Sequence, residues 1–153
     1  MLGTEVRLAP PEEIIWSKAF IMERERFDGA DILHLILATG DKLDWQRLLW
    51  RFGAHWRVLL AHLTIFGFAY PCDRARVPAE IMRILIERLR EETVQSEGGE
   101  LPQERICRGT LLSRAQYLVD IEDWRYQDAR LSEPASMTRE QIAQWTAAIP
   151  QDS

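Results

Sequence analysis

Apolar side chains recur at helical spacing near the start of the chain. Wound at about 100° per residue, the segment from Pro11 to Arg26 places apolar side chains on one broad side, and Lys18 falls among them. The apolar positions are Ile14, Ile15, Ile21 and Met22. The pattern predicts an amphipathic helix over this segment. A lysine on the apolar side of a helix calls for an explanation, because an unpaired ammonium is costly to bury.

The segments that follow also have helical spacing and are joined by short loops. Gly29 to Thr39 is short and apolar, and Asp44 stands at the N-cap of a helix that Gly53 ends. Ala54 to Ala69 is apolar almost all round, which predicts the most buried helix of the protein. We expect the tryptophans on these helices to pack in the core rather than to stack on a ligand. These are Trp16, Trp45, Trp50 and Trp56.

The remainder of the chain contains further helical segments. A long amphipathic helix is predicted to begin at Pro78, and the sequence QSEGGE at residues 95–100 is interpreted as a linker. A helix is then predicted from Ser113 to Trp124. Thr138 and Gln141 form a capping box before a last helix, which we expect to pack back through its tryptophan.

These patterns together predict an all-α fold, a compact multi-helix bundle with a short N-terminal strand or extended arm. The strand would cover Thr4 to Leu8, where polar and apolar residues alternate. We expect two domains: a helical domain over residues 1–95 and a C-terminal helical extension over residues 96–153 that packs on it.

Composition narrows the classes of function. The net charge is −5, which argues against a strongly basic nucleic-acid-binding surface. The two cysteines have no paired spacing and no secretory segment is recognisable, so we expect a cytoplasmic protein. The longest stretch without a formal charge, Val58 to Cys72, is shorter than the roughly 20 residues of a membrane-spanning helix. We therefore expect no membrane partner.

Lys18 and two aspartates meet at a tight corner in the sequence. Phe27 to Gly29 interrupt the helical pattern, Asp28 stands at the N-cap of the next helix, and Asp31 falls in its first turn. In a structural interpretation, both aspartates serve that helix and the Lys18 ammonium reaches solvent to pair with Glu25 or an aspartate.

The same residues carry a resemblance to a known family. The run GTEVRLAPPEEIIWSKAFIMERERFDGADI resembles the later motifs of bacterial nucleotidyltransferase-fold proteins, including the AbiEii-type toxin enzymes. The similarity continues through LDWQRLLWRFGAHWRVLLAHLTIFGFAYP and CRGTLLSRAQYLVDIEDW. The resemblance implies that Lys18 reaches a nucleoside triphosphate and that Asp28 and Asp31 support this nucleotide-binding site.

The chain departs from that family in one respect. The enzymes carry, upstream, a Gly-Ser turn and an Asp-x-Asp strand that hold divalent metal, and this half is missing. Nucleotidyl transfer needs such carboxylates to fix the metal ions. We therefore expect a C-terminal helical portion that is not catalytic alone. It would need Mg²⁺, a nucleoside triphosphate, and a separate catalytic domain or a second copy.

Other chemistry has little support in the sequence. Gly109-Thr110 followed by Asp120 and Glu122 superficially resembles the missing motif, but a helix would turn carboxylates two residues apart by about 200° from each other. His55 and His62 lack a third ligand in register, so no metal site is expected. The alternative function is a non-enzymatic helical module for protein interaction.

Overall fold

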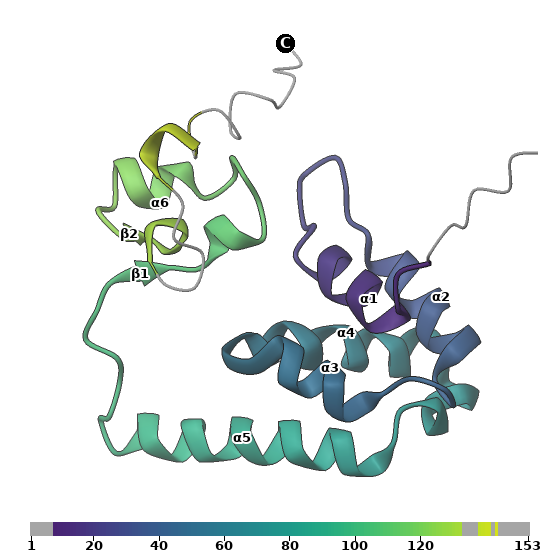
Figure 1. Ribbon diagram of the computed structural model, residues 1–153. Helices are drawn as coiled ribbons and strands as arrows, with labels where there is room; N and C mark the ends of the chain where they lie inside the picture. The colour runs from purple at the N-terminus through teal and green to yellow at the C-terminus, as the bar shows by residue number, and fades with distance from the viewer. Residues whose placement is uncertain (1–7, 133–137, 142, 144–153) are drawn as a thin grey trace, which may run out of the picture. The chain divides into compact units, whose positions relative to one another are not determined.

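The computed structural model describes residues 8–132, 138–141 and 143. It confirms the all-α prediction, since helices dominate and the described residues pair into a single two-stranded sheet (Figure 1). The α-helices are α1 (Pro11–Ala19), α2 (Gly29–Thr39), α3 (Trp45–Phe52), α4 (Trp56–Ala69), α5 (Ala79–Glu97) and α6 (Leu118–Glu122). Short 3₁₀ helices are η1 (Gly53–His55), η2 (Pro71–Arg76), η3 (Gly109–Leu111) and η4 (Ala129–Leu131), and the strands are β1 (Ile106–Cys107) and β2 (Gln127–Asp128).

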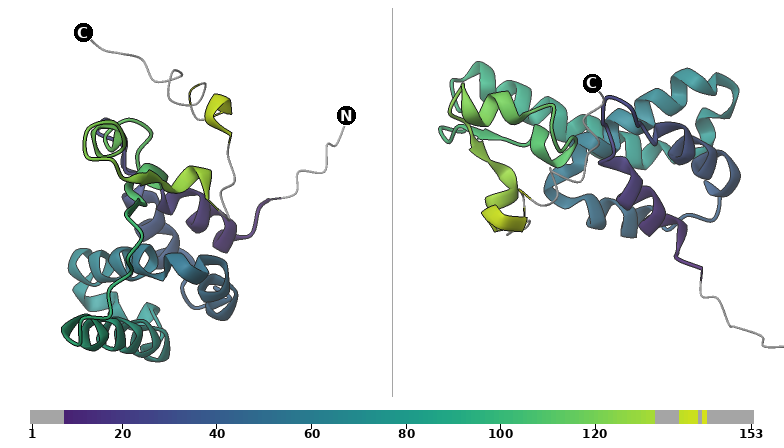
Figure 2. Two further views of the ribbon diagram at one scale, coloured as in Figure 1. Left: turned by 90° about the vertical axis from the view of Figure 1, so that its left-hand side faces the viewer. Right: turned by 90° about the horizontal axis from the view of Figure 1, so that it is seen from above.

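The described residues form two compact units. The first unit contains residues 8–19 and 28–97, and the second contains residues 20–27 and the described residues from 98 onward. Figure 2 shows helices α1 to α5 of the first unit from two further directions. The expected division into domains 1–95 and 96–153 stays a prediction.

The core of the first unit is built from apolar side chains on all five of its α-helices. Helix α4 contacts each of the other four, so it is the helix around which the unit is assembled. Side chains with at most 2% exposure come from every helix: Ile15, Ala19, Ile32, Ile36, Leu48, Phe52, Leu59, Phe66, Ile81 and Leu85. Burial of such side chains is the dominant favourable term in folding.

Helix α1 is shorter than the sequence pattern predicts. It ends at Ala19, whereas the pattern continued to Arg26. The backbone N–H of Met22 donates to the carbonyl of Leu112 at 3.0 Å, and Met22 pairs in an antiparallel bridge with Phe27. These contacts within the second unit satisfy backbone groups that a longer helix would have used. Met22 therefore does not extend the apolar side of α1.

Helix α4 is also less enclosed than expected. Its inner side is buried, but Ile65 is 40% and Phe68 is 86% exposed. On α3, Trp50 is 77% exposed, so the prediction that this tryptophan packs in the core is wrong. Both helices place one side on the core, and these apolar residues point the other way. An apolar sequence therefore did not guarantee burial at these positions.

The second unit is held together by polar contacts. Strands β1 and β2 are parallel, with Ile106 opposite Gln127. The Glu23 carboxylate accepts hydrogen bonds from the Ser113 hydroxyl at 2.7 Å and from the Arg114 backbone N–H at 3.0 Å. Helix α6 covers only Leu118–Glu122, so the predicted helix from Ser113 was too long.

Some sequence predictions concern the ends of the described chain. Thr138 and Gln141 form the predicted capping box: the Thr138 N–H donates to Gln141 Oε1 at 2.8 Å, and the Gln141 N–H donates to Thr138 Oγ1 at 3.2 Å. The predicted N-terminal strand, apart from Leu8, lies outside the described residues, as does Trp145. Within the described ranges, no helix combines the length and apolar character needed to cross a membrane.

Candidate functional site

Lys18 lies near the C-terminal end of α1. Contacts with residues at the start of α3 hold this helix in place. Pro11 occupies the first position of α1, and the next two residues are glutamates, a sequence that favours a helix start. The buried Glu12 accepts a hydrogen bond from the Asp44 backbone N–H at 2.7 Å. Glu13 accepts from Arg47 at 2.9 Å. The helix that carries Lys18 is therefore fixed against α3 at its N-terminal end.

A buried histidine binds the other end of α1. His62 on α4 is 1% exposed, and its Nε2 atom lies 3.1 Å from the carbonyl oxygen of Ala19. The carbonyl accepts only, so Nε2 carries the hydrogen and donates. Burial lowers the pKa of His62 from its ordinary value of 6.5, which keeps the ring neutral. This contact fixes the last residue of α1, next to Lys18.

The structure brings the three predicted nucleotide-binding residues together. Lys18 Nζ donates to Asp28 Oδ2 at 2.9 Å and to Asp31 Oδ2 at 2.7 Å. The Asp28 side chain is 8% exposed, Lys18 is 26% exposed and Asp31 is 57% exposed. The cluster therefore runs from a buried carboxylate to one that faces solvent.

The N-cap position of Asp28 was predicted correctly, but its side chain does not cap α2. It forms no side-chain cap hydrogen bond to that helix. Its carboxylate instead pairs with Lys18, while Asp31 sits in the first turn as expected. The ion pairs therefore connect the end of α1 to the start of α2, ten and thirteen residues further along the chain.

The electrostatics of the cluster are set by one cation between two anions. Hydrogen bonding to Asp31 and then to Asp28 raises the pKa of Lys18 above its ordinary value of 10.5. The ammonium is therefore charged throughout the physiological range. An ammonium has three N–H donors, and the described residues use two of them. The third is available to an oxygen atom of a ligand.

The cluster does not by itself make a metal site. Asp28 and Asp31 supply two carboxylates, and the Lys18 ammonium already engages both. Across the described part of the chain, no group of three histidine, cysteine, aspartate or glutamate side chains is placed to hold a metal ion. Magnesium prefers nearly octahedral oxygen coordination, so further ligands would have to come from elsewhere.

The two acidic residues that superficially resemble the missing motif lie on a helix, as the sequence predicted. Asp120 and Glu122 lie on helix α6, and Gly109 begins a 3₁₀ helix rather than a turn before a strand. Carboxylates two residues apart on a helix point in different directions. This pair therefore does not reproduce the paired carboxylates of a nucleotidyltransferase strand.

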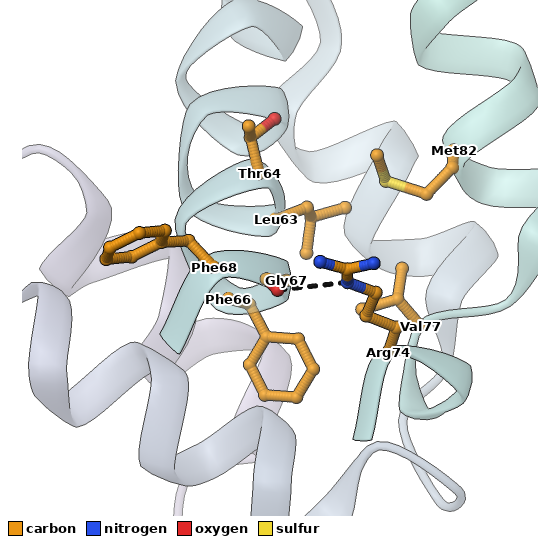
Figure 3. Close-up of a pocket in the computed structure, with 8 residues that line it drawn as sticks. All are labelled: Leu63, Thr64, Phe66, Gly67, Phe68, Arg74, Val77 and Met82. Atoms are coloured by element: carbon orange, nitrogen blue, oxygen red, sulfur yellow. Dashed lines mark hydrogen bonds between the residues drawn. The ribbon is translucent and has the colours of Figure 1, made fainter. Parts of the chain in front are cut away.

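Sequence reasoning missed a pocket on the first unit. It lies between α4, η2 and the start of α5, and Arg74 and Phe68 both line it (Figure 3). The sequence pattern treated Phe68 as part of a buried helix, so the apolar periodicity did not indicate this site. An arginine beside the apolar helix end was the available hint, because a cation there has to face either an anion or solvent.

Comparisons with known proteins add no identification. No family model, no curated protein and no solved structure matches the chain at a significant level.

Proposed function

We propose that this chain is the helical C-terminal portion of a nucleotidyltransferase-like bacterial protein of the cytoplasm. In this proposal Lys18, Asp28 and Asp31 contribute to a nucleoside triphosphate site. The observation that supports it is the distance from Lys18 Nζ to the two carboxylates, 2.9 and 2.7 Å. The resemblance picked out these three residues, and they lie together at one corner of the first unit.

Each of the three residues has a distinct part in the proposed site. The remaining Lys18 N–H would donate to a phosphate oxygen, as a compact positive charge commonly does. Asp28, with its side chain 8% exposed, would hold the ammonium in place. Asp31, which is 57% exposed, would be the member closest to an incoming ligand in solvent.

The charge balance of the cluster explains why the chain would not act alone. One ammonium and two carboxylates leave a net charge of −1, which repels a triphosphate. Mg²⁺ bound to the phosphates would offset this repulsion. The metal-holding carboxylates would come from a separate catalytic domain or from a homo-oligomer. The isolated chain should therefore bind triphosphate weakly and transfer no nucleotide.

Calorimetric titration tests the proposed site directly. ATP, GTP, CTP and UTP, each with Mg²⁺, would be titrated into the wild-type chain, Lys18→Met and Lys42→Met. Lys42 is the chain's other lysine and is exposed, so it is the matched control. We expect at least one triphosphate to bind, with affinity reduced tenfold or more in Lys18→Met and unchanged in Lys42→Met. Equal binding by wild type and Lys18→Met would contradict the proposal.

A second candidate is the non-enzymatic helical interaction module. It is favoured by the exposed aromatic side chains Phe68, 86% exposed, and Trp50, 77% exposed. Exposed aromatic residues are enriched at the centres of protein interfaces. Sedimentation velocity of wild type, Phe68→Ser and Trp50→Ser would test a homo-oligomer. This candidate would be favoured over the nucleotide site by two results together: the wild-type chain associates but binds no triphosphate, and either substitution abolishes the association.

A further inference from the structure

The pocket on the first unit has apolar walls. Leu63 and Phe68 come from α4, Val77 follows η2, and Met82 belongs to the first turns of α5 (Figure 3). Its volume is about 380 Å³, at the lower end of the range of about 300–1,000 Å³ that is usual for small-molecule sites. Leu63 and Val77 are buried, so the pocket reaches the edge of the hydrophobic core.

One exposed cation, Arg74, borders these apolar walls. Arg74 Nε donates to the carbonyl oxygen of Gly67 at 3.0 Å. This contact fixes the guanidinium plane, and Figure 3 shows its two terminal nitrogens on the side toward Leu63. Among the residues that the structure describes, no carboxylate forms an ion pair with Arg74. The terminal nitrogens are therefore positioned to bind an anion from outside the unit.

We infer that this pocket binds a small amphiphilic carboxylate, with its apolar tail on Leu63, Val77 and Met82 and its head group on Arg74. A guanidinium forms two parallel hydrogen bonds with a carboxylate, and such charge-assisted pairs are stronger than neutral ones. The apolar walls provide no second cation for a more highly charged phosphate. The site lies apart from Lys18 in the sequence and does not depend on the proposed nucleotide site.

Three probes with the same tail and different head groups test this inference. Octanoate, 1-octanol and octylammonium would be titrated at pH 7 into the ¹⁵N-labelled full chain, with amide shifts followed by NMR. We expect octanoate to shift signals of the pocket residues and to bind at least tenfold more tightly than octanol, with octylammonium weakest. Equal affinity for octanoate and octanol would overturn the inference.

Two variants assign the preference to the arginine. Arg74→Gln should reduce octanoate affinity to that of octanol, whereas Arg90→Gln, which removes an exposed arginine from the middle of α5, should leave the preference intact. Thr64 lines the pocket and is exposed, so Thr64→Glu should pair with Arg74 and exclude octanoate while octanol still binds. This second variant keeps the test decisive if Arg74→Gln fails to fold.

The same spectra detect the alternative occupants of the pocket. An octanoate preference that survives both Arg74→Gln and Thr64→Glu would place the carboxylate elsewhere and overturn the inference. Pocket signals that shift with protein concentration, lose that shift in Phe68→Ser and do not respond to octanoate would identify a second copy of the chain as the occupant. That result would also overturn it.

Discussion

His62 Nε2 on α4 donates to the carbonyl oxygen of Ala19, the last residue of α1, across 3.1 Å. The two residues are 43 positions apart. The last carbonyl groups of a helix lack partners within the helix, and here a buried ring supplies one. The contact therefore ties the end of the Lys18 helix to the centre of the first unit.

The protonation of His62 should make stability depend on pH. Burial lowers the pKa of His62 below 6.5, so the unfolded chain binds its proton at higher pH than the folded chain. The stabilisation is complete above pH 6.5 and is lost as the pH falls from there through the folded pKa. Between pH 7.5 and 5, the free energy of unfolding measured with urea should decrease less for His62→Gln than for wild type. His34→Gln, at an exposed position of α2, should behave as wild type.

The Lys18 cluster should contribute to stability through its buried member. Lys18→Met removes the ammonium that lies 2.9 Å from the Asp28 carboxylate, which is 8% exposed, and removing one member of a buried ion pair is destabilising. The melting temperature should therefore fall in Lys18→Met and recover in Lys18→Met/Asp28→Asn. Asp31→Asn should have little effect, because that side chain is 57% exposed. A melting temperature that is unchanged in Lys18→Met would mean that Asp28 is stabilised in another way.

Two adjacent leucines on α4 should differ in their cost of truncation. Leu59 is 1% exposed, whereas Leu60 is half-buried. Leu59→Ala should lower the free energy of unfolding by about 2–5 kcal/mol, the usual range for a leucine removed from a core. Leu60→Ala should cost about 1 kcal/mol, because less apolar area returns to water. Equilibrium urea unfolding measures both, and equal losses would show that α4 is enclosed on both sides.

Two glycines should respond in opposite directions to alanine. A Cβ on Gly40 would lie 2.7 Å from the Ile36 carbonyl oxygen and 2.9 Å from that of Arg76, and neither backbone atom yields easily. Gly40→Ala should therefore cost about 1–3 kcal/mol, as overpacking does. At Gly67 the nearest atoms are 3.6 Å or more away, so Gly67→Ala should gain up to about 1 kcal/mol from helix propensity. Thermal unfolding of both variants measures whether each substitution raises or lowers stability. A Gly40→Ala variant more stable than wild type would show that the two backbone oxygens do not crowd a Cβ at this position.

Local sequence determined the helical class and several helix ends. Asp44 accepts a hydrogen bond from the Arg47 backbone N–H at 2.9 Å, and the Thr138–Gln141 box forms as its spacing predicts. Such caps depend on residues three apart, so no distant contact is needed to establish them. Lys18 meets Asp28 and Asp31 for a related reason, since the three positions lie on either side of one chain reversal.

Only the tertiary structure decided where α1 ends and which apolar residues face solvent. The apolar periodicity predicted that α1 continues to Arg26. In the structure His62 binds the carbonyl of Ala19, where α1 ends, and Leu112 accepts from the N–H of Met22, which lies beyond the helix; both partners are distant in sequence. Phe66 is fully buried and Phe68 is 86% exposed, although both lie on the same apolar helix. A side chain is buried only where another element covers it, and the spacing of residues within one helix does not specify that neighbour.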